Sequence, residues 1–82
     1  METRIAVVSI IVENPEVVSE LNNLLHEFSE YVIGRMGIPY REKKVNIISV
    51  AMDAPMDKIN TLTGLLGKIE GLSAKVAYSK VN

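Results

Sequence analysis

An internal repeat with a spacing of forty residues sets the strongest limit on the fold of this chain. When Val8–Pro15 is set over Ile48–Pro55, serine falls on serine, an acid on an acid and proline on proline. Both segments begin in stretches rich in Val and Ile, which favour strands. Both end in a proline, a residue common where a helix begins. The sequence therefore predicts two β-α-β halves.

The periodicity of the apolar residues predicts the remaining elements. A helical period runs from Glu16 to Phe28 and again from Pro55 to Ile69, with Gly71 as the expected stop of the second helix. Tyr31–Tyr40 is predicted to be an edge strand, because a central strand tolerates its two glycines and its proline poorly. The other expected strands are Arg4–Glu13, Val45–Asp53 and the alternating segment from Leu72 to Ser79.

Together these elements predict one α+β domain over residues 1–82, of ferredoxin-like βαββαβ architecture. We expect a four-stranded antiparallel sheet with two helices on one face. Within it, we expect the first and third strands to be parallel neighbours in the centre and the second and fourth to form the edges.

Both faces of the two central strands are apolar, although the helices of such a fold cover only one. The face expected under the helices holds Val8, Ile10, Val12, Ile48, Val50 and Met52. The opposite phase holds Ile5, Val7, Ser9, Ile11, Val45, Ile47, Ser49 and Ala51. A solvated face is normally polar, so we predict a homo-oligomer, a dimer or a tetramer, with Ile5, Val7, Ile11 and Ile47 in its interface. The alternative is local strand propensity with scattered exposed side chains.

Composition excludes several classes of function. Nine basic and ten acidic residues give a net charge of −1, without the basic excess of a nucleic-acid binder. The absence of cysteine rules out disulfides and thiolate metal sites. The first residues lack the layout of a signal peptide, and no apolar run approaches the roughly 18 residues of a membrane span. We therefore expect a soluble, cytoplasmic protein that binds neither nucleic acid directly nor a membrane.

Catalytic and metal-binding patterns are equally sparse. His26 is the single histidine, with Glu30 one turn later, and a solvated helix face explains this pair better than a metal site does. No Ser-His-Asp set is legible. We expect no catalytic residues, no metal and no cofactor.

The clearest candidate site lies on the predicted edge strand and the turn after it. Gly34 and Gly37 flank Arg35, and Arg41 follows at the start of a charged turn, so bare backbone and cations could meet an anionic ligand or a partner. The alternative is an edge strand protected by glycine, proline and charge. Candidate ligand- or partner-binding residues are Gly34, Arg35, Gly37 and Arg41, with Asn14 from the turn after the first strand.

Two glycines interrupt the second predicted helix. Gly64 and Gly67 each cost about 1 kcal/mol relative to alanine in a helix. We therefore expect the backbone to approach a neighbour closely there. Packing against a strand is the favoured cause, and the approach of a ligand is the alternative.

Two stretches, Gly34–Glu42 and Leu62–Gly71, resemble the signature segments of the small bacterial iron-only hydrogenase system regulators. That family's fold is similar to ACT domains and to the ligand-sensing domain of nickel-responsive repressors. The resemblance covers essentially the whole chain. It implies an ACT-like regulatory or sensory module that acts through a small ligand at a subunit interface or through a partner protein.

Two departures limit what the resemblance implies. Amino-acid-binding ACT domains commonly have an Asp-x-Pro-Gly turn, whereas this chain has Glu13-Asn14-Pro15-Glu16, in which Glu16 replaces the small residue. The nickel site of the repressors uses several histidines and a cysteine, which this chain lacks. If the protein regulates transcription, we expect the DNA-binding element on another chain. A purely structural oligomerisation module is the alternative function.

Overall fold

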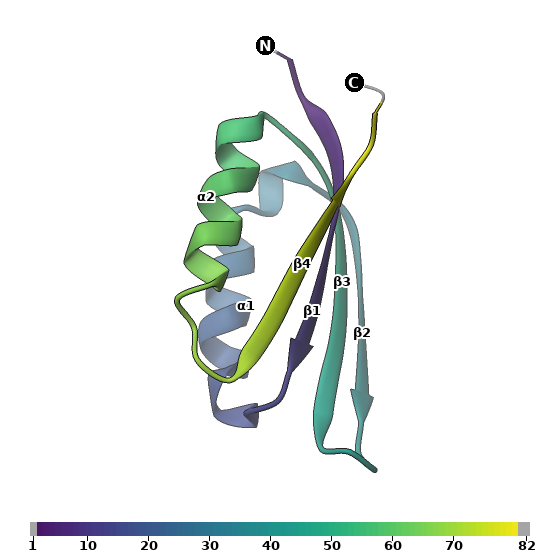
Figure 1. Ribbon diagram of the computed structural model, residues 1–82, viewed down its shortest axis with the longest axis vertical. Coiled ribbons are helices and arrows are strands. Elements are labelled where there is room, and N and C mark those ends of the chain that lie inside the picture. The colour runs from purple at the N-terminus through teal and green to yellow at the C-terminus, as the bar shows by residue number, and fades with distance from the viewer. Residues whose placement is uncertain (1, 81–82) are drawn as a thin grey trace.

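The computed structural model describes residues 2–80 and consists of two layers, a four-stranded sheet and two helices packed against one of its faces (Figure 1). The ferredoxin-like prediction is confirmed. In chain order the elements are β1 (Arg4–Val12), η1 (Pro15–Val17), α1 (Val18–Glu27), η2 (Ser29–Tyr31), β2 (Val32–Tyr40), β3 (Val45–Ala54), α2 (Met56–Leu66) and β4 (Leu72–Tyr78), where η marks a short 3-10 helix.

The strand order is β2-β3-β1-β4, with every neighbouring pair antiparallel. The prediction that β1 and β3 run parallel is therefore wrong. The crossover through α1 makes β2 run in the same direction as β1, and the tight turn at residues 41–44 then reverses the chain into β3. A strand that follows β2 through a hairpin must oppose β1, whichever edge β2 occupies.

The core lies between the two layers. The β1 and β3 side chains on this side, which we call the helix face, are buried: Val8, Ile10, Val12, Val50 and Met52 are fully enclosed and Ile48 is nearly so. Leu21 and Leu25 from α1 and Ile59, Leu62 and Leu66 from α2 complete the core. The predicted phase of both central strands is confirmed.

The second helix ends earlier than its apolar period predicts. It stops at Leu66, with Gly67 at its C-cap, and the predicted stop at Gly71 is wrong. Beyond it, Lys68 and Ile69 donate backbone hydrogen bonds to residues only three positions earlier, which tightens the chain into a turn. Ile69 lies in this turn, where it stays buried and lines the hollow between the two helices.

The two helix glycines also differ from expectation. A Cβ added at Gly64 would meet nothing within 4 Å, and one at Gly67 would touch only carbonyl oxygens of the preceding turn at 3.5 Å. Neither glycine is needed for a strand to approach α2, so that prediction is wrong.

Candidate functional site

A β-bulge in β2 decides which way the candidate residues point. Val32 pairs with Met52 and Gly34 with Ala51, so Ile33 is an extra residue in the ladder. The bulge shifts the phase of the strand by one. As a result Arg35, opposite Val50, lies on the helix face, whereas Met36 and the alternate residues after it lie on the other side of the sheet.

Arg35 reaches across a groove between β2 and α1. Its Nη2 donates a hydrogen bond of 3.0 Å to Oδ1 of Asn22. Within the described residues this is the hydrogen bond that the Arg35 side chain makes. A guanidinium carries five N–H donors. Most of its donors are therefore available to a ligand.

This α1–β2 groove has a volume of about 280 Å³ and combines an apolar floor with polar walls. Leu25 and Val50 are buried at its base, while Asn22, His26 and Ser29 are exposed on successive turns along α1 and after it. None of the described residues that line it is acidic. A cationic side chain above an apolar floor suits a small molecule with one anionic end. The full lining is Asn22, Leu25, His26, Ser29, Val32, Arg35 and Val50.

Arg41 belongs to a different groove. It lies in the β2–β3 turn and lines a hollow of about 260 Å³ with Lys44, Tyr40, Pro39 and Pro15 among others. Arg41 follows Arg35 by six positions of mostly extended chain, which corresponds to about 20 Å along the strand. The structure therefore does not bring the two candidate arginines together.

The candidate glycines of β2 lie on opposite faces of the sheet. Gly34 pairs with Ala51, and Gly37 pairs with Ile48 of the helix face. A Cβ at either position would meet nothing within 4 Å, so no contact within the described chain requires a glycine there. Both leave bare backbone exposed on the edge strand.

Asn14 has a clear structural contact. Its Oδ1 accepts a hydrogen bond of 3.0 Å from the Glu16 backbone N–H and so caps η1. The backbone N–H groups of Glu13 and Asn14 both donate to the Gly71 carbonyl, at 2.7 and 2.9 Å. These bonds form a latch between the end of β1 and the entry to β4.

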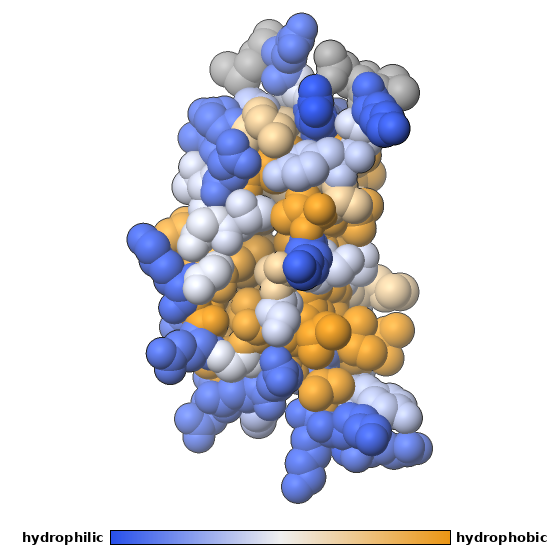
Figure 2. Space-filling model, in the orientation of Figure 1, coloured by the Kyte–Doolittle hydropathy of each residue, from blue (hydrophilic) through white to orange (hydrophobic). Residues whose placement is uncertain are grey.

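The sheet side away from the helices, here called the open face, forms a second candidate site. Figure 2 shows apolar residues along the right-hand side of the molecule, where this face lies, between polar residues at both ends. Its β1 and β3 residues are those of the predicted second phase. The bulge adds Met36, Ile38 and Tyr40 from β2, which the sequence analysis missed although a glycine inside a strand is a signal for a bulge.

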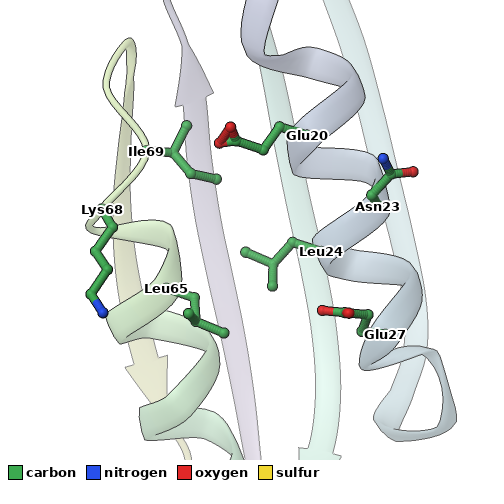
Figure 3. Close-up of a pocket in the computed structure, with 7 residues that line it drawn as sticks. All are labelled: Glu20, Asn23, Leu24, Glu27, Leu65, Lys68 and Ile69. Atoms are coloured by element: carbon green, nitrogen blue, oxygen red, sulfur yellow. The ribbon is translucent and has the colours of Figure 1, made fainter.

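A third hollow lies between the helices. In Figure 3, Leu24 and Glu20 of α1 extend across the gap toward Leu65 and Ile69. It measures about 350 Å³ and its charged lining residues are Glu20, Glu27 and Lys68. None of the predicted site residues borders it.

Across residues 2–80 no three His, Asp or Glu side chains come together as a metal site would require. In the same range, no helix is long and apolar enough to cross a bilayer.

The fold and these surfaces define a small α+β module of the ferredoxin-like class. The chain belongs to the TM1266-like family, whose description is "Iron-only hydrogenase system regulator, putative" and whose profile matches residues 4–76.

Two solved structures illustrate the relationship. TM1266 from Thermotoga maritima, described as an uncharacterized protein, is 35% identical, with a TM-score of 0.92 over 96% of this chain and all of that one. A formyltetrahydrofolate deformylase from Pseudomonas putida KT2440 is 17% identical, with a TM-score of 0.68 over 89% of this chain and 28% of that one. The second likeness is one of fold alone. Among curated proteins, none matches the sequence.

Proposed function

We propose that the protein is a regulatory module of an iron-only hydrogenase system that acts by binding and not by catalysis. The observation that carries this proposal is the family match, which extends over residues 4–76 and so includes both structural halves. A binding role also fits the shape of the molecule, whose open face and α1–β2 groove offer contact surfaces. Measurable turnover of a metabolite by the pure protein would contradict the non-catalytic part.

The proposed ligand is a small molecule that carries a carboxylate or phosphate group, bound in the α1–β2 groove. Arg35 supplies donors that can pair with two oxygens at once, and the Leu25 and Val50 floor suits an apolar remainder. The groove is slightly smaller than the roughly 300–1,000 Å³ of drug-sized sites, so the ligand would be a small metabolite.

The regulatory role is tested by deleting the gene in its own organism and measuring hydrogenase activity. Loss of a regulator should change the rate of hydrogen turnover in cell extracts at least severalfold, and the wild-type gene should restore it. Hydrogenase activity and transcript levels that stay unchanged under every growth condition would overturn the proposal.

The ligand is tested separately by native mass spectrometry of protein purified from its own organism. We expect a small bound species on the wild type that is lost from Arg35→Ala. Arg41→Ala is the matched control, because this arginine comes from the same stretch but lines another groove. Since both side chains are exposed, stability should change by less than about 0.5 kcal/mol in either variant.

Three outcomes separate the alternatives. A species retained by Arg35→Ala would place the ligand elsewhere. A co-purifying chain without a small ligand would favour regulation through a partner protein. Wild-type protein that carries neither would favour the purely structural oligomerisation module.

A further inference from the structure

Exposed apolar side chains are concentrated on the open face. Ten large hydrophobic residues of the described chain are exposed, and seven of them lie on this one side of the sheet. The seven are Ile5, Val7, Ile11, Met36, Ile38, Tyr40 and Ile47, with exposed fractions between 36% and 55%. Scattered exposure would distribute them over both layers.

The strand registers show that the patch is continuous. Ile38, Ile47 and Ile11 lie side by side across three strands. Two residues further along, Ser49 pairs with Ser9, and the next row on this face joins Gly34, Ala51, Val7 and Ala77 across all four strands. Small side chains in these rows keep the surface low, so another flat surface can approach it closely.

The exposed apolar area is comparable with one side of a protein–protein interface. From their exposed fractions, the seven side chains leave on the order of 600 Å² in water, at the upper end of the largest patch on an ordinary monomer. Smaller neighbours such as Val45, Ala51 and Ala77 add to this. The total approaches the roughly 800 Å² that each partner contributes to a stable protein–protein interface.

The charges on this face favour a copy of the same chain as the partner. Among the described residues of this face there is one cation, Lys75, which lies opposite Ser9. Two acids lie near its two ends: Asp53 pairs with Ile5, and Glu13 accepts a hydrogen bond of 3.3 Å from Ser73. An isologous interface must be complementary to itself. A face with both signs at its margin meets this requirement, whereas it would repel a uniformly acidic partner with its own two acids.

We propose that the open face is the interface with a second copy of this chain, packed sheet against sheet. Two sheets packed in this way lie about 10 Å apart with their inner side chains in contact. The helix layers and both α1–β2 grooves then remain on the outside of the assembly, where a ligand can reach them.

The first test is the mass of the assembly by light scattering coupled to size exclusion at tens of micromolar. For the wild type we expect the mass of a dimer, or of a larger assembly with an even number of chains of 9.1 kDa each. Val7→Glu should reduce this to the monomer mass, because it places a carboxylate in the middle of the interface. Met56→Glu is the matched control: its side chain is similarly exposed, 41% against 37%, but lies at the start of α2, and it should keep the wild-type mass.

A wild-type monomer overturns the proposal, and so does Val7→Glu with an unchanged mass. Dissociation by Met56→Glu would overturn it as well, because the interface would then involve the helix layer. Binding of a different protein to the open face, in place of a second copy of this chain, would also overturn the proposal.

A second measurement does not depend on whether Val7→Glu folds. The chain has no cysteine, so single cysteines report on one site each. Ser9→Cys lies on the open face and Ser19→Cys on the exposed side of α1. At tens of micromolar, we expect a maleimide reagent to label Ser9→Cys at least tenfold more slowly than Ser19→Cys, with the difference shrinking on dilution. Equal labelling rates at high concentration would overturn the proposal.

Discussion

Ile10 and Ile11 are chemically identical neighbours on β1 in opposite surroundings. Ile10 points into the helix face and is fully buried, whereas Ile11 points to the open face with 47% of its surface exposed. The same contrast holds between Ile48 and Ile47 on β3, at 6% and 39%. The two sides of the sheet are thus made from similar residues, and only one of them is covered within the chain.

This contrast arises because the chain's own helices bury one face of the sheet and not the other. Both crossovers of the chain pass on one side of the sheet, so the helices can cover that side alone (Figure 1). A face destined for solvent gains little from Val and Ile, beyond their fit to a strand. Apolar residues in both phases therefore fit the proposal of two covers, one made by the chain's own helices and one by a second copy of the chain.

Shortening one isoleucine at a time tests the difference between the two faces most directly. Ile10→Ala should lower the free energy of unfolding by about 2–5 kcal/mol, because it leaves a cavity in a closed core. For an isolated chain of this length the whole free energy of unfolding is only about 4–12 kcal/mol. Urea unfolding followed by circular dichroism measures the loss, which should be the same at every protein concentration.

Ile11→Ala is the matched variant on the open face. It should cost on the order of 1 kcal/mol per protomer through lost burial between chains. Its effect should therefore fade as the protein is diluted below the dissociation constant of the dimer. If Ile11→Ala costs as much as Ile10→Ala under dilute conditions, the two faces are equally important to the single chain and the comparison fails.

The sequence predicts the elements well because it encodes them locally. Alternation on β1 and β3 and the helical period after each proline suffice to separate the buried phase from the open one. Strand direction is not local. The expectation that β1 and β3 are parallel was wrong because the turn at residues 41–44 reverses the chain between β2 and β3.

The candidate site was less predictable, because it depends on one extra residue. The bulge at Ile33 sends Arg35 toward α1 and Met36 toward the open face. A one-residue shift exchanges the faces of every following side chain in a strand. Sequence alone could therefore identify Arg35 as a candidate but could not place Asn22 and His26 across a groove from it.

An effect smaller than that of Ile10→Ala is expected at the latch between the end of β1 and the entry to β4. Gly71 has φ of +96°, and a Cβ there would lie 2.6 Å from the Cβ of Asn14. Gly71→Ala should therefore cost about 1–3 kcal/mol through backbone strain and this clash. Thermal and urea unfolding measure the loss.

The double variant with Asn14→Gly separates the two causes of that loss. Removing the Asn14 side chain relieves the clash but not the strain at Gly71. Gly71→Ala should accordingly cost less in the Asn14→Gly background than in the wild type. An identical cost in both backgrounds would show that contact with Asn14 contributes nothing.

Gly64→Ala should change stability least, and the sign of the change indicates whether the outside of the helix layer is covered. Gly64 lies in α2 with open space where a Cβ would be. If the outside of the helix layer faces water, Gly64→Ala should raise the free energy of unfolding by roughly 0.5–1 kcal/mol, because alanine loses less backbone freedom in a helix. The gain should appear in urea unfolding without a change in assembly mass. A loss of stability, or a smaller assembly, would mean that another chain packs closely on α2, and the outside of the helix layer would then have to be counted among the covered surfaces.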